Sequence, residues 1–347
     1  MSNDTPAMIS IRDLKVHFPV TTTGLFRKSA AMVKSVDGVS LDIQPGETMG
    51  LVGESGCGKT TLGRAILRLV ELTSGQVLFH NQDLAQLSSR QMRAHRRQLQ
   101  VIFQDPYASL NPRMTISQII GEPLSTFRLA EGAAKRQRVE ELMQLVGLSP
   151  RFMKRYPHEF SGGQRQRIGI ARALAVDPEF IVADEPISAL DVSIQSQIMN
   201  LLERLRAEKN LTYLFISHDL RAVRHLSNRV AVMYLGRIVE LADARAVYDE
   251  PLMPYTRALI SAVPVPDPKI ELTRQRIVLQ GEVPSPVNPP TGCRFRTRCP
   301  FAISACAEVE PQLVEIKPGH FAACIRISPE QPDIEQAASG DAPGIRN

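Results

Sequence analysis

Short apolar runs of strand length recur along the chain. They occupy residues 8–18, 36–43, 48–52, 99–103, 180–183, 211–216 and 230–234. Stretches with helical spacing lie between several of these runs, and the one after residue 58 carries Leu62, Ala65, Ile66 and Leu69 on one face. Strands that alternate with helices pack as a mostly parallel sheet with helices against it. The pattern therefore predicts an α/β fold.

The alternation is interrupted over residues 115–175, where the pattern is helical throughout. Within this stretch, residues 138–146 place four apolar side chains on one face: Val139, Leu142, Leu145 and Val146. We therefore expect an α-helical subdomain inserted into the sheet domain. Residues 21–34 are polar, and we expect a loop there.

Prolines become frequent after Glu250. They are Pro251, Pro254, Pro264, Pro266, Pro268, Pro284, Pro286, Pro289 and Pro290. Proline breaks long helices and strands, so a separate C-terminal module is expected. The predicted division is residues 1–105 and 176–250 for the core, 106–175 for the helical subdomain, 251–327 for the extension, and 328–347 for a polar, disordered tail.

Composition is ordinary for a globular protein. The 347 residues are 43% hydrophobic and 22% charged, and 41 Lys and Arg against 36 Asp and Glu give a net charge of +5. The densest basic run is Arg90, Arg93, Arg96 and Arg97. It predicts a solvated helix face, with an acidic partner or a lipid surface as the alternative. Aromatic residues make up only 5%, and Trp is absent, which argues against binding of single-stranded nucleic acid.

Nothing in the sequence predicts a membrane span, because no apolar run approaches the roughly 18–20 residues that a spanning helix needs. Residues 1–10 lack the charged and apolar segments of a signal peptide. We therefore expect the protein to stay in the cytoplasm and to serve a membrane, if at all, from its surface.

The strongest motif runs from Gly53 to Thr60, in the order Gly53, Glu54, Ser55, Gly56, Cys57, Gly58, Lys59 and Thr60. It matches the phosphate-binding pattern G-x-x-x-x-G-K-[ST], and it lies between a predicted strand and a predicted helix, as that pattern requires. Glycines let backbone N–H groups face phosphates, and a helix N-terminus adds positive potential. Lys59 is expected to contact the β- and γ-phosphates, and Thr60 to bind Mg²⁺. Thr61 is included in the same nucleotide site.

A second motif places two carboxylates at the end of an apolar strand. Asp184 and Glu185 follow the run that ends at Ala183. We expect Asp184 to hold Mg²⁺ and Glu185 to orient the water that attacks the γ-phosphate. Such a pair is a weak signal alone and a strong one beside a phosphate loop.

Four further motifs follow in a fixed order, and with them the chain resembles the ATP-binding cassette (ABC) ATPases. Ser161, Gly162, Gly163 and Gln164 resemble the signature motif, which usually begins with Leu where this chain has Phe160. Gln104 resembles the Q-loop glutamine, Asp191 the D-loop aspartate and His218 the switch histidine. The resemblance covers about residues 9–241. It implies a RecA-like mixed sheet with an inserted helical subdomain.

The resemblance also implies roles for these residues. Signature residues in this family face the nucleotide of the opposite subunit, so two ATP molecules lie between two subunits. Glu185, His218, Gln104 and Lys59 are expected to be catalytic, with Gln104 also near Mg²⁺. Phe18 is expected to stack on adenine, and a strand-end packing role is its alternative.

Two segments resemble the dipeptide and oligopeptide importers within this family. They are residues 103–112 and 254–259, and residues 281–286 resemble the same family's C-terminal extension. The chain departs from the pattern at Met253, where the family commonly has His. The implied partners are a second, homologous ATPase subunit in a heterodimer, two membrane permeases contacted near residues 104–111, and an extracytoplasmic solute-binding protein, with no nucleic acid. The implied location is the cytoplasmic face of the inner membrane.

Four cysteines crowd near the C-terminus: Cys293, Cys299, Cys306 and Cys324. A cysteine group in a cytosolic chain indicates metal before disulfides. The spacing lacks the C-x-x-C pair of most structural zinc sites, and Pro300 follows Cys299 as proline often follows a cluster cysteine. We expect a [4Fe–4S] cluster, with zinc or free thiols as alternatives.

Two other functions stay open on the sequence alone. One is a soluble ABC ATPase of DNA repair or translation, although the chain has no long coiled coil and only one cassette. The other is a redox- or iron-sensing ATPase whose main function lies in the cysteine module. The solute of an importer also stays open among dipeptides, longer peptides, glutathione and nickel complexes.

Overall fold

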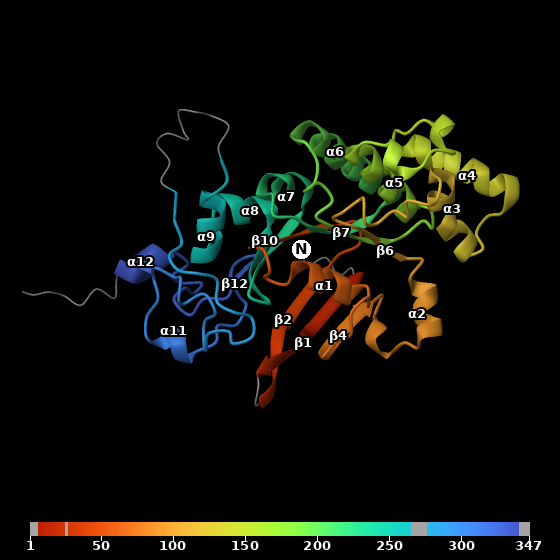
Figure 1. The fold of residues 1–347 in the computed structure, drawn as a ribbon. Coiled ribbons are helices and arrows are strands. Elements are labelled where there is room, and N and C mark those ends of the chain that lie inside the picture. Colours follow the sequence, from red (N-terminus) through yellow and green to blue (C-terminus); the bar gives the residue numbers. More distant parts are fainter. Residues whose placement is uncertain (1–5, 25–26, 265–275, 340–347) are drawn as a thin grey trace, which may run out of the picture.

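A computed structural model describes residues 6–24, 27–264 and 276–339 (Figure 1). Its larger sheet runs in the order β11-β12-β10-β9-β3-β8-β7-β6. These strands are β3 (Thr48–Val52), β6 (Leu99–Ile102), β7 (Phe180–Asp184), β8 (Thr212–Ile216), β9 (Arg229–Tyr234), β10 (Arg237–Asp243), β11 (Val314–Lys317) and β12 (His320–Ala322). Pairing is parallel from β9 to β6 and antiparallel from β9 to β11. The mixed sheet of the predicted α/β fold is confirmed.

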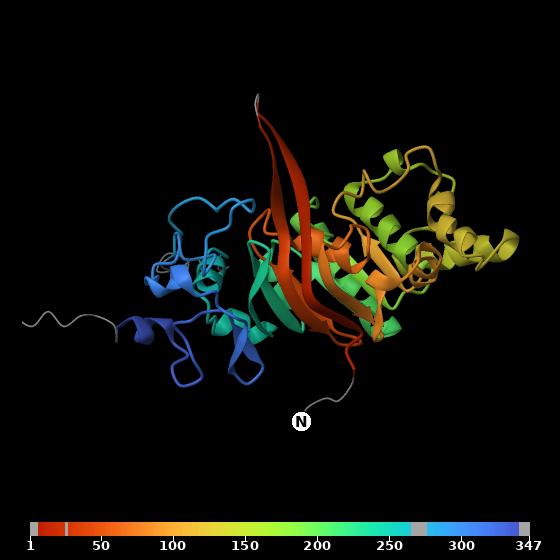
Figure 2. The same cartoon turned by 90° about the horizontal axis from the view of Figure 1, so that it is seen from below.

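A second sheet has the order β2-β1-β4-β5. Its strands are β1 (Ile9–Gly24), β2 (Arg27–Ile43), β4 (Ser74–Phe79) and β5 (Gln82–Asp83). Strands β1 and β2 pair along their whole length, and Figure 2 shows their ribbon extending away from the body of the protein. The loop expected at 21–34 is therefore wrong, apart from Leu25 and Phe26, which lie outside the described residues. Regular backbone pairing holds this ribbon in strand form without an apolar pattern.

The helices divide between the sheets and a separate lobe. Those of the core are α1 (Lys59–Ile66), α2 (Ser89–His95), α6 (Val192–Lys209), α7 (Leu220–Leu226) and α8 (Ala244–Asp249). Those of the lobe are α3 (Ile116–Thr126), α4 (Gly132–Leu145) and α5 (Gly162–Leu174), which lie together beside the sheet in Figure 1. The chain enters this lobe after β6 and leaves it before β7, as an insertion would.

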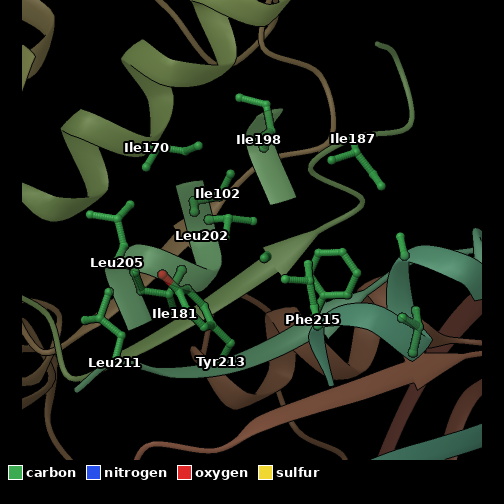
Figure 3. Close-up of a cluster of buried hydrophobic side chains, with 14 of the residues drawn as sticks. Ile102, Ile170, Ile181, Ile187, Ile198, Leu202, Leu205, Leu211, Tyr213 and Phe215 are labelled. Atoms are coloured by element: carbon green, nitrogen blue, oxygen red, sulfur yellow. The ribbon is translucent and has the colours of Figure 1, made fainter. Parts of the chain in front are cut away.

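Two hydrophobic clusters hold these layers together. Helix α1 packs between the two sheets, with Leu62 and Ile66 fully buried among strand residues such as Ile9 and Leu214. On the other face of the larger sheet, α6 directs Ile198, Leu202 and Leu205 at the strands (Figure 3). The strand residues that they meet include Ile181, Tyr213 and Phe215, each at most 3% exposed. The carboxyl ends of β3, β7 and β8 are thereby held in one row.

The C-terminal extension is joined to the core by backbone pairing and by several polar contacts, among them a fully buried carboxylate. Strand β12 pairs with β10, so the extension continues the larger sheet. Glu240 on β10 is fully buried, accepts the N–H groups of Leu252 and Met253 at 2.7 and 2.9 Å, and bonds His320 of β12 at 2.7 Å. These bonds satisfy a charge that would otherwise be costly to bury. They also fix where helix α9 (Pro254–Ser261) begins.

The tail differs from the sequence prediction. Residues 328–339 are ordered and include helix α12 (Ile334–Ser339), which follows the short helix α11 (Ala305–Glu308). Ile334 is fully buried, and Arg257 of α9 forms ion pairs with Asp333 and Glu335. The structure differs from the disorder expected for residues 328–339, because the buried side chains of Ile334 and Ala337 and two ion pairs hold this segment. Residues 340–347 lie outside the described residues.

No helix in the described part of the chain is long and apolar enough to cross a lipid bilayer.

Candidate functional site

The phosphate-loop motif lies between β3 and α1, and its glycines have backbone conformations that the fold requires. Gly53 and Gly58 have φ angles of +152° and +109°. A Cβ atom on Gly53 would lie 2.1 Å from the carbonyl oxygen of Met233, and one on Gly58 would lie 2.1 Å from that of Ser35. No side chain fits at such distances. The backbone of the loop therefore lies directly against the backbone of β2 and β9.

Lys59 is held inside this loop. Lys59 is only 6% exposed. Its Nζ donates to the carbonyl oxygens of Gly53 at 2.8 Å and Glu54 at 3.0 Å. The neighbouring Cys57 is buried, and burial raises the pKa of its thiol. Cys57 is thus a small, neutral packing residue. Lys59 supplies a positive charge at the base of the loop.

A cavity of about 540 Å³ opens over the loop. Its lining residues are Ser35, Ser55, Gly56, Gly58, Lys59, Thr60, Thr61, Gln104, Glu185 and His218. All but Ser35 were predicted as site residues from motifs. Ser35 donates a hydrogen bond to the Thr61 hydroxyl at 2.8 Å. Its position on the long ribbon gave no sequence signal.

Asp184 ends strand β7 beside the start of α1. The Thr60 hydroxyl donates to its Oδ1 at 2.9 Å. Burial raises the pKa of Asp184, and the bond from Thr60 opposes this rise. A hydroxyl and a carboxylate oxygen at this separation are donors of the type that Mg²⁺ prefers.

Glu185 is the point at which three sequence motifs meet. Gln104 Nε2 donates to its Oε2 at 3.1 Å, and Nδ1 of His218 lies 3.1 Å from the same oxygen. Glu185 has a φ of +47°, a left-handed conformation that is uncommon for a residue with a side chain. Its N–H donates to the carbonyl oxygen of Ile216 on β8 at 2.9 Å. This backbone turn directs the carboxylate toward the cavity.

The signature residues lie elsewhere. Ser161 caps helix α5, and its hydroxyl and backbone form a capping box with Gln164. Ser161 is exposed, and neither it nor Gly162, Gly163 or Gln164 lines the cavity over the phosphate loop. The exposed Asp191, which precedes α6, does not line it either. Within one chain, the signature residues and Asp191 therefore lie outside the cavity over the phosphate loop.

Phe18 also lies outside the lining of this cavity. It is on β1 opposite Val33 of β2, and 39% of it is exposed. An aromatic ring with this exposure is available for contact with another molecule.

The four C-terminal cysteines gather around one small cavity of about 20 Å³. Cys293 donates its N–H to the carbonyl oxygen of Cys306 at 2.8 Å. Burial raises the pKa of Cys299 to about 12 and that of Cys324 to about 11. Across the described residues, no group of three or more His, Cys, Asp or Glu side chains is arranged to hold a metal ion. Met253, where the family commonly has His, is buried and lines this cavity.

A separate groove of about 880 Å³ lies between the core and the helical lobe. It is lined by residues 68–72, which follow α1, by Ala85, by α2 and the residue after it, and by the end of α3. Arg68, Arg93 and Arg96 give it positive charge, and Leu72, Met92 and Phe127 give it apolar surface. The predicted solvated face of α2 thus borders a groove of mixed character.

Comparison with known proteins agrees with these features. A family model described as ABC transporter matches residues 36–188. A second, described as Oligopeptide/dipeptide transporter, C-terminal region, matches residues 239–306.

Curated relatives and solved structures extend the match. The chain is 56% identical to the oligopeptide transport ATP-binding protein AppF of Bacillus subtilis over 91% of this chain and 96% of that protein. It is 52% identical to OppF of Escherichia coli, an oligopeptide transport ATP-binding protein, over 93% of this chain and 97% of that one. A solved dimer of the ATP-binding cassette MJ0796 with ADP and Pi is 29% identical, with a TM-score of 0.61 over 69% of this chain and 99% of that chain.

Proposed function

We propose roles for the site residues on the basis of the family. The chain belongs to the ABC transporter family, in its oligopeptide and dipeptide branch. A member of this branch is the ATP-hydrolysing subunit of an importer, and hydrolysis drives the uptake of peptides. The cavity over the phosphate loop is then the ATP site. Nucleic-acid machinery and iron sensing are not favoured by these relatives.

ATP enters with its phosphates toward Lys59. The ammonium now donates to two loop carbonyl oxygens, and we propose that it turns to the β- and γ-phosphates when they arrive. Backbone N–H groups from Ser55 to Thr61 complete the phosphate cradle. Thr60 and Asp184 would hold Mg²⁺, with Gln104 beside it, and the bound ion would neutralise charge on the phosphate oxygens.

Glu185 orients the water that attacks the γ-phosphate. Gln104 and His218 both contact Oε2, so we assign the water to Oε1. His218 must donate through Nδ1, because a carboxylate only accepts. The meeting of these three motif residues above the phosphate loop is the observation that carries the proposal.

Replacement of Glu185 by Gln tests this role. We expect turnover to fall by about 100-fold or more, because the amide cannot accept a proton or polarise water. ATP binding should persist, since Lys59 and the loop are untouched, and the two ATPase subunits should stay closed on ATP. Turnover is measured in the assembled transporter, and subunit closure by size-exclusion chromatography with ATP.

The matched control is Glu250→Gln, which removes an exposed carboxylate paired with Lys317 in the extension. It should turn over ATP at the unmodified rate. Wild-type turnover in Glu185→Gln would contradict the role given to Glu185.

The signature acts on a second subunit's nucleotide. We base this on the exposed capping box at Ser161, which lies outside the cavity of its own chain. The dimeric state of MJ0796 supports the same arrangement. Asp191 would lie at this subunit interface, and the partner would be a homologous ATPase in a heterodimer. The functional domains would follow the division 1–105 with 176–250, 106–175 and 251–327.

The membrane permeases would contact the chain near residues 104–111, and we add to this surface the groove between core and lobe, which none of those residues lines. It pairs arginines with apolar side chains, and it lies at the junction between the lobe and the core. Two permeases and an extracytoplasmic solute-binding protein would complete the importer. The chain itself would then sit at the cytoplasmic face of the inner membrane as a peripheral subunit.

The four cysteines would hold a [4Fe–4S] cluster. Their number and type fit that group, and all four line one cavity, but among the described residues they are not arranged to hold a metal, so binding would require the four side chains to reorient. Burial raises the pKa of the Cys293, Cys299 and Cys324 thiols, so they are protonated without a metal, and a bound cluster would have to displace these protons. Bound there, the cluster would tie α9, α11 and the C-terminal loops together.

Anaerobic purification tests the cluster. A broad band near about 400 nm with about four iron and four sulfide per chain would support it. A colourless protein with one zinc would replace the cluster by a zinc site, and a metal-free protein would leave the cysteines as packing residues.

A further inference from the structure

The C-terminal extension reaches into the phosphate loop through one arginine. Arg298 donates from Nη1 and Nη2 to the two carboxylate oxygens of Glu54, at 2.7 and 3.0 Å. The Arg298 side chain is 7% exposed and that of Glu54 24%. A two-point contact of this kind fixes orientation as well as charge. These residues are 244 positions apart in the sequence.

A second residue of the extension holds the same loop position. The N–H of Glu54 donates to the hydroxyl oxygen of Tyr255 at 2.9 Å. Tyr255 is fully buried in helix α9 and packs with Tyr234 and Phe295. Both the backbone and the side chain of Glu54 are therefore held from the extension.

Glu54 occupies a sensitive place in the loop. It precedes Ser55, which lines the ATP cavity, and its carbonyl oxygen accepts from Lys59. A carboxylate without a partner here would repel the phosphates, because both are anions in a partly buried setting. The paired guanidinium removes that repulsion. The bidentate bond also raises the pKa of Arg298, so this residue keeps its charge.

We propose that Arg298 is a positioning residue for ATP binding, which neutralises Glu54 and holds the first half of the phosphate loop in its binding shape. The inference rests on the proposed function in one respect, namely that this loop binds the phosphates of ATP. It adds a role for the extension: the extension sets the affinity of the ATP site in its own subunit. The ABC core alone would carry an unneutralised carboxylate.

A purely structural role of Arg298 predicts a different result from charge neutralisation. Arg298 also lies 6.0 Å from the ring of Tyr234, so its loss could loosen the aromatic cluster. If only packing matters, removing the Glu54 charge cannot repair the loss of Arg298. If charge matters, it can.

The test is a double-mutant cycle on the full-length chain, with ATP affinity measured by isothermal titration of Mg²⁺ and ATP. We expect Arg298→Gln to weaken ATP binding about tenfold, because it exposes the Glu54 charge to the phosphates. Glu54→Gln alone should change affinity less than Arg298→Gln does. Adding Glu54→Gln to Arg298→Gln should recover most of the lost affinity. The loss in Arg298→Gln should shrink at about 0.5 M salt, where charges are screened.

Arg296→Gln is the matched control. It removes the same charge two residues away, where Nε donates to the carbonyl oxygen of Thr291 within the extension. It should bind ATP as the unmodified chain does. Melting temperatures of all variants report whether the extension stays folded.

Two outcomes would overturn the inference. One is an Arg298→Gln variant that binds ATP with unchanged affinity. The other is a double variant as weak as Arg298→Gln, which would leave only a packing role. Failure of the proposed function looks different, because Lys59→Ala would then bind ATP as tightly as the unmodified chain whatever the state of Arg298.

Discussion

Helices α1 and α5 begin in different ways, although for both motifs we propose that the helix N-terminus faces a nucleotide phosphate. Helix α1 is capped by Gly58 without a side-chain bond, and the surrounding backbone dictates its loop. Helix α5 is capped by the exposed Ser161, and the nearest atom to a Cβ on Gly162 would be Leu190 Cδ2 at 3.5 Å. An ordinary van der Waals distance does not require glycine. Contacts within the chain thus explain why residue 58 is glycine. Nothing close to Gly162 in the described part of the chain requires glycine there, so a contact with another molecule would have to explain it.

The largest effect is expected at Gly58, where the fold itself forbids a side chain. In Gly58→Ala the new Cβ would lie 2.1 Å from the Ser35 carbonyl oxygen, at a φ of +109°. We expect a loss of stability on the order of 3 kcal/mol and a loss of ATP affinity of about 100-fold, because the loop must shift. Thermal unfolding and ATP titration measure the two effects.

Gly56→Ala is the comparison for this variant. Gly56 has a φ of +78°, and a Cβ atom added there would meet no other atom within 4 Å. Backbone strain of about 1–2 kcal/mol should be its only cost in stability. Equal stability losses in the two variants would show that backbone conformation, and not contact with β2, makes Gly58 necessary.

A smaller effect on turnover, without a loss of stability, is expected at Gly162. Alanine suits a helix start better than glycine, so Gly162→Ala should gain about 0.5 kcal/mol in stability. Turnover in the assembled transporter should still fall about tenfold or more, because a methyl group would meet the partner's nucleotide.

Gly169→Ala in the same helix controls for the change in helix propensity. Its Cβ would meet no atom within 4 Å. It should therefore raise the melting temperature and leave turnover unchanged. Wild-type turnover in Gly162→Ala would place the signature away from any nucleotide and remove the contrast between α1 and α5.

The same contrast explains what the sequence could predict. Motifs with strong local spacing, such as residues 53–60 and Asp184 with Glu185, identified most of the cavity lining. Apolar runs located the central strands, because buried parallel strands are continuous in hydrophobicity. Both kinds of signal lie within short stretches of sequence, so they can be read without knowing the fold.

Other features depend on contacts between distant residues. The ribbon at 21–34 is formed by backbone pairing between β1 and β2, and the polar sequence there gave no strand pattern. Helix α12 depends on the buried side chains of Ile334 and Ala337, and Ile334 belongs to a cluster of residues far away in the sequence. The bonds of Arg298 to Glu54 join residues 244 positions apart in the sequence and leave no periodicity to detect. Tertiary structure creates these features, so the sequence did not predict them.

The smallest effect is expected at Phe18. The phosphate half of the ATP site is fixed by backbone, whereas Phe18 is 39% exposed on β1 and outside the lining of the cavity. If its ring stacks on adenine, Phe18→Leu should raise the KM for ATP about threefold and leave kcat unchanged, because stacking contributes about 0.5–1.5 kcal/mol. Phe18→Tyr keeps an aromatic face and should retain the original KM. An unchanged KM in Phe18→Leu would make Phe18 a strand residue only.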